Sequence, residues 1–430
     1  PDCAVCSEHY VEAFGLNCNK CSEAPGGIAL AVAITIFGIF TVVAVFSYLL
    51  SGDMERNGQG FVNNIARRLP LQTIKIIVVV WQILTQFTSV ANVTYPDIYQ
   101  NFLDSVDFLN FDISWVLSAG CIIELDFHDR LLLTTLGPIA AIVILCGTYA
   151  VAMCRNCNSE IALRNVRHKH VSMALLVTFL VYSSVSSVVF QMFACDDLDD
   201  NRSYLRADYS IECDDPKHKL LMVYAGVMIF VYPVGIAALY AHLLFTNRDV
   251  FHREAGREES FRAKATSDLW TPYKPSRYYY EIIECARRIL LAGVVVFIFP
   301  NTAAQIAITL ILALFFIFVS EGLAPYESRW DAWISRIGHA VIFMSMYLAL
   351  LLKVNVSDET YNSQMAFETI LVSIHVFMVL AALVEAILMA CVLRVEQIED
   401  NDTLVRFKRP SIWFVKKDTS LVDFGNPSKS

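Results

Sequence analysis

The sequence has few charged residues and lacks the signatures of the common enzyme classes. Only 17% of its 430 residues are charged, 56% are hydrophobic, and the mean hydropathy is +0.50. This composition is too apolar for a soluble globular protein of this length. The chain also lacks a Walker loop, an HExxH zinc motif, a GxSxG motif and a dinucleotide-binding fingerprint. We therefore expect neither an enzyme nor a nucleic-acid-binding protein, and no resident organic cofactor.

What the chain does contain is nine long apolar segments. A helix needs roughly 20 apolar residues to cross a bilayer, and each segment is long enough. The sequence therefore predicts an all-α polytopic membrane domain over residues 27–394. The sixth segment is the least apolar, because its first two turns contain Glu284, Arg287 and Arg288. The predicted spans are 27–50, 71–93, 130–153, 171–194, 219–245, 281–299, 302–323, 333–353 and 365–393.

Basic residues and glycosylation sequons predict the same orientation for these spans. Sixteen Lys and Arg residues lie in the gaps after odd-numbered spans, 51–70, 154–170, 246–280 and 324–336. Five lie in the gaps after even-numbered spans, 94–129, 195–219, 300–301 and 353–364. Basic connections face the cytoplasm. Sequons at Asn92, Asn201 and Asn355 all follow even-numbered spans, where N-linked glycans would be extracellular. We predict an extracellular N-terminus, a cytoplasmic tail over 395–430, and a location in the plasma membrane or another surface or flagellar membrane.

The N-terminal residues 1–26 are rich in cysteine. Cys3, Cys6, Cys18 and Cys21 follow the pattern C-x2-C-x11-C-x2-C. In a cytosolic protein this spacing suggests zinc, whereas outside a membrane disulfides are favoured because the compartment is oxidising. We favour disulfides. A module this small has almost no core of its own, so we interpret it as the last unit of a longer extracellular cysteine-rich domain.

The predicted outer loop 95–129 contains a short amphipathic stretch. Ile98, Phe102, Val106 and Leu109 recur at helical spacing, with aspartates between them. The stretch is too short to span a bilayer and suits an interfacial or re-entrant segment. We favour a cap helix packed on the outer ends of the spans over a re-entrant element that lines a pore.

The second predicted outer loop, 195–219, combines cysteines with aspartates. Cys195 and Cys213 can form a disulfide with each other or with Cys121 of the first loop. Together the two loops hold 15 acidic and 4 basic side chains, which would concentrate cations at the outer face. Clustered carboxylates can bind calcium, but the spacing is not that of an EF-hand, and we favour a solvated acidic surface. The candidate calcium ligands are Asp196, Asp197, Asp199, Asp200, Asp214 and Asp215.

Several polar residues are predicted to lie within spans, where they are costly and often functional. Glu385, His375 and His339 are candidates for an ion or proton path, and hydrogen bonding between helices is the alternative for each histidine. Pro233 and Gly235 interrupt the fifth span and predict a kink or gating hinge. At the cytoplasmic end of the sixth span, a charged group is expected to clamp a lipid phosphate or a neighbouring helix. Its members are Glu284, Arg287 and Arg288.

The order of several short motifs carries a family resemblance. The cysteine-rich module precedes a polytopic domain with the residues Tyr278, Tyr279, Tyr280, Glu281, Glu284, Cys285, Ala286, Arg287, Arg288, Gln305, Pro325 and Tyr326. This order resembles the membrane domain of algal and protist surface proteins with ephrin-receptor-like cysteine-rich repeats. It is more loosely similar to the nine-span transient-receptor-potential-like proteins of fungi. The resemblance implies that residues 1–26 end an ephrin-receptor-like or EGF-like module.

Three hypotheses for function follow from these features. The leading one is a cell-surface cation channel, or a channel-like sensor of tension or ligand. The rival is a membrane anchor or receptor for an extracellular cysteine-rich fibre, hair or wall component. A lipid transporter is the third, suggested by the basic group in the sixth span. The expected partners are membrane lipids, an extracellular cysteine-rich or fibrous assembly, and further copies of this chain in a homo-oligomer.

Overall fold

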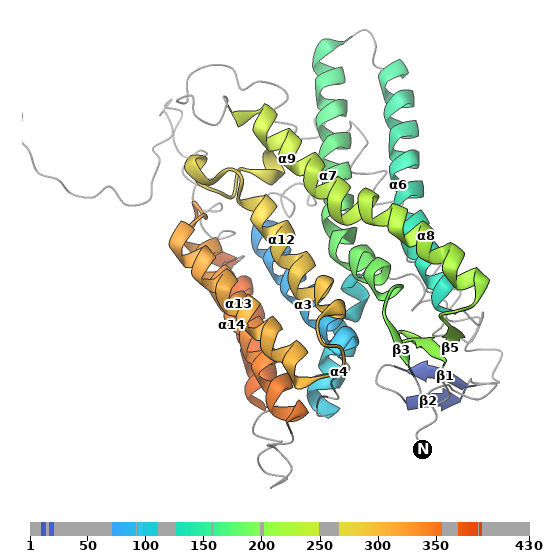
Figure 1. Ribbon diagram of the computed structural model, residues 1–430. Coiled ribbons are helices and arrows are strands. Elements are labelled where there is room, and N and C mark those ends of the chain that lie inside the picture. The colour runs from blue at the N-terminus through green and yellow to red at the C-terminus, as the bar shows by residue number, and fades with distance from the viewer. Residues whose placement is uncertain are drawn as a thin grey trace, which may run out of the picture. The chain divides into compact units, whose positions relative to one another are not determined.

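The computed structural model consists mainly of helices (Figure 1). It describes residues 10–13, 17–20, 71–91, 93, 95, 97–110, 126–155, 159–197, 202–248, 266–354, 369–385 and 387–388. All elements discussed below belong to one unit, which ends at Ala386. The predicted span 27–50, the three sequon asparagines (Asn92, Asn201, Asn355) and the tail 395–430 lie outside the described residues.

Among the described residues, six helical segments are long and apolar enough to cross a membrane, so the chain is a membrane protein. They coincide with the predicted spans at 71–93, 130–153, 171–194, 219–245, 302–323 and 333–353. The segments are α3 (Leu71–Ala91), α6 (Phe127–Arg155), α7 (Glu160–Gln191), the continuous run α8 (Pro216–Val231), η3 (Tyr232–Ile236) and α9 (Ala237–Thr246), α13 (Ala303–Leu323) and α14 (Arg329–Lys353).

Two further predicted spans are described, one of them only in part. The segment 281–299 is not one long helix but α12 (Tyr280–Ala292) followed by the 3-10 helix η6 (Val294–Phe297). Gly293 separates the two, and the three consecutive valines that follow it are poor helix formers because they are β-branched. Within the predicted span 365–393, an apolar helix runs over Thr369–Glu385, and residues 365–368 and 389–393 lie outside the described residues.

Contacts define two ends of the helix bundle. At the hairpin end, a three-stranded sheet of β3 (Cys195–Asp197), β4 (Ser203–Leu205) and β5 (Asp208–Glu212) connects α7 to α8. Arg206 of this sheet donates a hydrogen bond to the Val296 carbonyl of η6 at 3.2 Å. At the linker end, the residues before α12 meet the α13–α14 turn, where Tyr273 pairs with Tyr326.

The described segments alternate in direction between these two ends. The start of α3 lies at the linker end, where Lys75 Nζ is 3.4 Å from the Asp268 carbonyl. The start of α6 lies at the hairpin end, where the Phe127 amide donates to Asp208. The last helix returns to the linker end, where Glu385 accepts a hydrogen bond from Thr73. The short α12–η6 segment therefore also passes from one end of the bundle to the other.

Burial separates a central helix from peripheral ones. In the most apolar part of α3, 72% of the residues are buried, against 22% for α6 and 28% for the α8–α9 segment. Ile83, Leu84 and Phe87 of α3 pack in the core, whereas Phe230 of α8 is 73% exposed. Wide exposed apolar faces of this kind are suited to contact with lipid or with another copy of the chain.

Glycine permits two tight features of this fold. A Cβ atom at position 235 would lie 2.7 Å from the Phe230 carbonyl oxygen, inside the π-helical turn η3. The predicted kink around Pro233 and Gly235 thus takes the form of a π-helical turn, a feature frequent at functional sites. Elsewhere, a Cβ at position 338 would lie 2.7 Å from a Val80 methyl group, so Gly338 lets α14 approach α3 closely.

Candidate functional site

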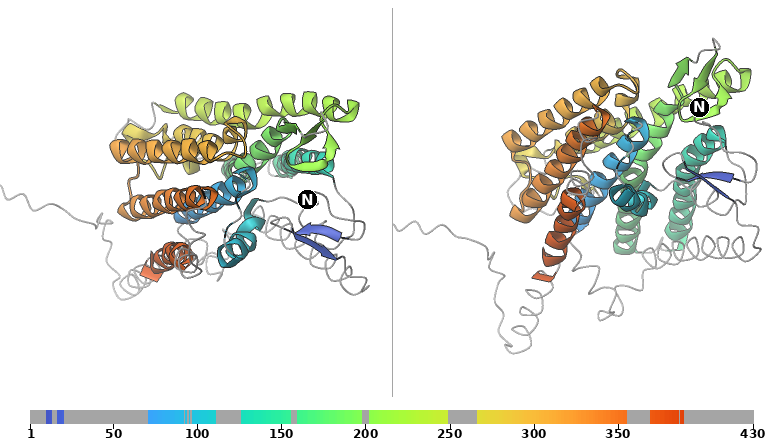
Figure 2. Two further views of the ribbon diagram at one scale, coloured as in Figure 1. Left: turned by 60° about the horizontal axis from the view of Figure 1, so that its bottom comes forward. Right: turned by 90° about the horizontal axis from the view of Figure 1, so that it is seen from below.

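The amphipathic stretch of loop 95–129 is inserted between the helices of the bundle. It forms α4 (Asp97–Val106) and the 3-10 turn η2 (Asp107–Asn110), and α4 lies beside α3 (Figure 2). In this turn the Leu109 carbonyl accepts a hydrogen bond of 2.8 Å from Gln82 Nε2, which also donates to the Leu180 carbonyl of α7. Gln82 lies nine residues before the end of α3, roughly 14 Å along the helix axis. The turn therefore sits at mid-height of the bundle, unlike the cap at the helix ends that we favoured from the sequence.

Polar groups of α3 hold the turn in place. Asn110 Nδ2 donates to Thr85 Oγ1 at 2.9 Å and to Asp107 at 2.6 Å, while Asn110 Oδ1 accepts from Gln86 Nε2 at 3.0 Å. Buried amides are stable only when bonded in this way. These residues were not predicted from the sequence. Gln82 and Gln86 lie four residues apart on one face of an apolar helix, and this pattern indicates a buried polar partner.

His375 fastens α4 from the other side. Trp81 Nε1–H donates to His375 Nδ1 at 3.3 Å, so the ring proton must lie on Nε2, which is 3.1 Å from the Tyr99 hydroxyl. That hydroxyl can then donate to Ser345 Oγ at 2.9 Å. The ring of His375 is completely buried. These bonds join four helical segments, which fits the interhelical alternative weighed for this histidine.

The two faces of α4 differ in chemistry. Tyr99, Leu103 and Val106 face the core and are buried. The opposite face exposes Asn101 and Ser105, which lie on the same side of a helix because they are four residues apart, together with Ile98, which is 56% exposed and lies on that side three residues before Asn101. This face therefore offers polar side chains to whatever lies beside the inserted segment.

Glu385 lies at the linker end, far from His375 along the same helix. Its Oε2 accepts a hydrogen bond of 2.6 Å from Thr73 Oγ1, which is also 3.4 Å from Asp331 Oδ1. A hydroxyl has one proton, so the shorter contact is the donated bond. The three predicted path residues thus occupy separate places, since His339 belongs to a different cluster.

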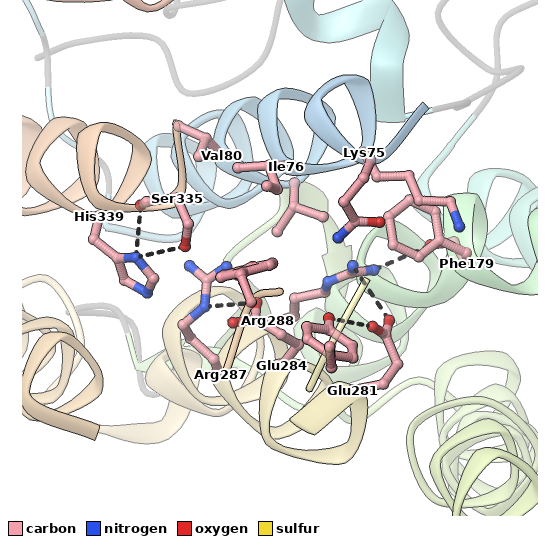
Figure 3. A pocket seen from close by; sticks show the side chains of 14 residues that line it. Lys75, Ile76, Val80, Phe179, Glu281, Glu284, Arg287, Arg288, Ser335 and His339 are labelled. Atoms are coloured by element: carbon pink, nitrogen blue, oxygen red, sulfur yellow. Dashed lines mark hydrogen bonds and ion pairs between the residues drawn. The ribbon is translucent and has the colours of Figure 1, made fainter. Parts of the chain in front are cut away.

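That cluster is a buried group of charges, here called the ion cluster, formed by Glu281, Glu284, Arg287 and Arg288 of α12 (Figure 3). Arg287 pairs with Glu284 at 2.6 Å, and Arg288 lies 4.0 Å from Glu281. The Arg288 guanidinium also stacks over the Phe179 ring at 4.1 Å and donates to the Phe179 carbonyl. The predicted clamp therefore contacts a neighbouring helix, through Arg288 against α7. The two acidic and two basic side chains of the ion cluster balance in charge.

A cavity of about 20 Å³ adjoins the ion cluster. Among the described residues, Glu284 Oε1, Arg288 Nε and His339 Nε2 line it as buried atoms without a hydrogen-bond partner. His339 Nδ1 donates to the Ser335 carbonyl at 2.7 Å, so Nε2 is an acceptor. One water needs roughly 10–15 Å³; its protons suit the two acceptors, and its oxygen suits the Arg288 Nε–H donor. The volume suits water rather than a phosphate group.

We therefore expect an ordered water in this cavity. A cryo-EM map that resolves solvent should show a peak at hydrogen-bonding distance, about 2.7–3.2 Å, from at least two of the three atoms. Density for the side chains with a dry cavity between them would contradict this expectation.

The candidate calcium ligands do not converge on one site among the described residues. Asp196 pairs with Arg206 at 2.7 Å and accepts from Tyr209 and from Asn301 Nδ2. Asp197 accepts from a serine, and Asp214 pairs with a lysine. Asp199 and Asp200 lie outside the described residues. Asp196 instead ties the sheet to the turn before α13.

The ion pair between Asp196 and Arg206 should make the stability of the fold depend on pH in the acid range. Burial acts to raise the pKa of Asp196, but hydrogen bonds from Arg206 and Tyr209 and the Arg206 charge outweigh it and lower the pKa. In the unfolded chain the pKa of an aspartate is about 3.9. Because the pKa of Asp196 is lower in the folded state, its ionised form stabilises the fold above that pH, and the stabilisation is lost as the pH falls through the folded-state pKa. Asp196→Asn should therefore melt at a lower temperature than wild type near neutral pH. Below about pH 4 the difference between the two melting temperatures should become smaller.

The control for this measurement is Asp214→Asn. Asp214 also pairs with a base, Lys219, but its side chain is 74% exposed, and surface pairs contribute little. Its melting curve should follow wild type at each pH. An equal gap between Asp196→Asn and wild type at all pH values would contradict the assignment.

One predicted disulfide is present, between Cys195 and Cys213. It joins β3 to the residue after β5. Cys3, Cys6, Cys21 and Cys121 lie outside the described residues. Cys18 lies in β2 (Asn17–Lys20), which pairs antiparallel with β1 (Tyr10–Ala13) in the N-terminal module.

Comparison with known proteins adds no relative. No family model, no curated protein and no solved structure matches this chain. Its function must therefore be argued from the inserted segment, the ion cluster and the hairpin end themselves.

Proposed function

We propose that the protein is a cation channel of a cell-surface membrane, with the α4–η2 segment beside the conducting path. The observation that carries the proposal is the hydrogen bond from Gln82 to the Leu109 carbonyl, which holds the 3-10 turn η2 at mid-height of a membrane bundle. With a hydrocarbon core about 30 Å thick, a turn roughly 14 Å from the helix end lies near its centre. Backbone that departs from the regular α-helix is tolerated at that depth only inside protein or beside water.

The exposed face of α4 supports a water-filled path rather than a lipid contact. Asn101 and Ser105 lie on this face. The Ser105 hydroxyl donates within α4 to the Phe102 carbonyl at 2.6 Å, so the cost of placing this face in hydrocarbon falls on the Asn101 amide and is on the order of 2–7 kcal/mol. Water in a path between copies of the chain would solvate this amide. We therefore place this face toward the axis of a homo-oligomer, with the half-exposed Asp104 near it as an attraction for cations.

The proposed orientation places the hairpin end outside the cell. The disulfide at that end suits an oxidising compartment, and the longest basic connection, 246–280, starts and ends at the other. Tension or a bound ligand is favoured over voltage as the stimulus. The ion cluster has no net charge, so moving α12 as a unit would transfer no net charge through the field.

Cysteine accessibility in cells tests the path. Whole-cell currents under membrane stretch should appear on expression of the wild type. Extracellular cationic methanethiosulfonate should then reduce the current by half or more in Ser105→Cys and Asn101→Cys. The matched control is Leu103→Cys, whose side chain is only 2% exposed in the same helix and should not react.

Purified protein provides a second measurement that does not depend on the stimulus in cells. Proteoliposomes of the monodisperse protein should release or take up sodium or calcium under osmotic tension. Surface-expressed protein that carries no current, together with liposomes that show no flux, would reject the channel. Equal inhibition of the current in Leu103→Cys and Ser105→Cys would contradict the position of α4 beside the conducting path.

A further inference from the structure

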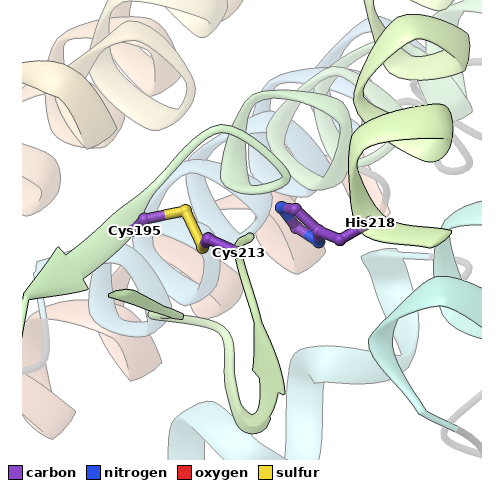
Figure 4. A group of neighbouring side chains, drawn as sticks. All are labelled: Cys195, Cys213 and His218. Carbon is purple, nitrogen blue, oxygen red and sulfur yellow. A yellow bond between two sulfur atoms is a disulfide. The ribbon is translucent and has the colours of Figure 1, made fainter. Parts of the chain in front are cut away.

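The hairpin end holds a compact group of sulfur and nitrogen ligands (Figure 4). The sulfur atoms of Cys195 and Cys213 and one ring nitrogen of His218 all lie within 4.8 Å of one another. His218 belongs to the first turn of α8, and its ring is turned toward the disulfide. Its side chain is completely buried, and Cys213 is 9% exposed.

One hydrogen bond and one ion-pair contact bear on which nitrogen of His218 carries the proton. Its Nδ1 lies 3.2 Å from His128 Nε2, and His128 Nδ1 lies 3.6 Å from the Asp126 carboxylate. The carboxylate favours a proton on His128 Nδ1, which leaves His128 Nε2 as the acceptor for His218 Nδ1–H. His218 Nε2 then carries a lone pair, and it has no hydrogen-bond partner among the described residues.

An unpartnered lone pair on a buried ring is costly unless a ligand uses it. Imidazole nitrogen with two sulfurs is the donor set that zinc prefers, and neutral histidines held by a second hydrogen bond are its usual ligands. The disulfide blocks such use, because sulfurs bonded to each other are not thiolates. Reduction would remove this block without moving the ligands far.

We propose that Cys195, Cys213 and His218 form a zinc site when the disulfide is reduced. An external dithiol would transfer two electrons, so that the sulfur–sulfur bond breaks, two thiols form and the dithiol becomes a disulfide. Zinc then binds the two thiolates and His218 Nε2, and both thiol protons pass to solvent. Water completes the tetrahedron.

The spacing of the group fits this geometry. Tetrahedral zinc, with bonds of about 2.3 Å to sulfur and 2.0–2.1 Å to nitrogen, holds its ligand atoms roughly 3.5 Å apart. The sulfurs would have to separate by less than 2 Å, on the order of one rotamer adjustment. The Cα atoms of the two cysteines, 6.5 Å apart, need little movement.

The site would act on the part of the fold that joins the sheet to α12 and α13. Asp196 follows Cys195 directly, and its pair with Arg206 connects the sheet to the Val296 carbonyl and to Asn301. Replacing the disulfide by a zinc ion would therefore affect the turn between η6 and α13. This inference does not rest on ion conduction.

Zinc content of the full chain tests the site. The protein in detergent is reduced with dithiothreitol, freed of reductant by anaerobic gel filtration, equilibrated with zinc chloride and measured by mass spectrometry of the metal. Because the chain has 12 cysteines, the decisive quantity is a difference. The wild type should hold one zinc more than Cys195→Ser/Cys213→Ser. Equal zinc content in the two proteins would overturn the proposal.

A second measurement keeps every thiol and guards against misfolding of the double variant. His218→Gln leaves all cysteines in place and should weaken this zinc at least tenfold. In the reduced wild type, cobalt should give thiolate charge-transfer and tetrahedral d–d bands whose intensity falls in His218→Gln. Identical cobalt spectra and zinc affinity in wild type and monodisperse His218→Gln would equally overturn the site.

Discussion

Arg287→Met should destabilise the protein by about 3–5 kcal/mol, because it leaves the buried Glu284 carboxylate without its partner. The Arg287–Glu284 contact is 2.6 Å, and both side chains are less than 10% exposed. A loss of this size is a large part of a typical stability of about 5–15 kcal/mol. It should appear as a lower unfolding midpoint in mixed detergent micelles and as a lower yield of monodisperse protein.

The chain offers a matched control for this experiment. Arg336 and Glu321 also approach to 2.6 Å, but their side chains are 48% and 47% exposed. Arg336→Met should cost no more than about 1 kcal/mol, since solvent screens an exposed pair. Replacing both partners, as in Glu284→Leu/Arg287→Met, should recover much of the loss. Equal costs at positions 287 and 336 would show that burial does not govern the cluster.

Gln82→Leu should release the inserted turn from the bundle. The change removes the donor to the Leu109 carbonyl and leaves that buried acceptor unsatisfied, at a cost of about 1–3 kcal/mol. Hydrogen exchange of the amides in 97–110 should accelerate by about ten- to a hundredfold, since each 1.4 kcal/mol is a factor of ten in a local opening equilibrium. Mass spectrometry of peptides from this segment measures the change.

Thr309→Val is the control for the exchange measurement. Its hydroxyl is equally buried, but it donates within α13 to the Gln305 carbonyl. Exchange in 97–110 should match wild type in this variant. If Gln82→Leu leaves the exchange of 97–110 unchanged, the turn is not held by this bond, and the proposal for the conducting path loses its main support.

Much of the membrane fold could be predicted from hydrophobic length alone. Within the part of the chain that the structure describes, six of the predicted spans are helices long and apolar enough to cross a bilayer, because the bilayer imposes a minimum length that is visible in the sequence. The same rule failed at 281–299, where length was sufficient but the charges of Glu284, Arg287 and Arg288 are held inside the bundle by a shorter helix.

The candidate site was much less predictable. Periodicity identified a short amphipathic helix near Ile98 and Val106, but not its depth. Depth depends on partners far away in sequence, such as Gln82, Ser345 and His375, which the helix meets only after the bundle has assembled. A single sequence does not show which buried polar groups pair with each other.

The sequence by itself therefore determined that this is a helical membrane protein, and where most of its long helices begin and end, because hydropathy acts locally along the chain. Only the tertiary structure decided that α4–η2 enters the bundle, that the charges of α12 cancel within one cluster, and that His218 faces a disulfide. Each of these depends on contacts between segments that are distant in the chain, and satisfying buried polar groups is a property of the whole packed bundle.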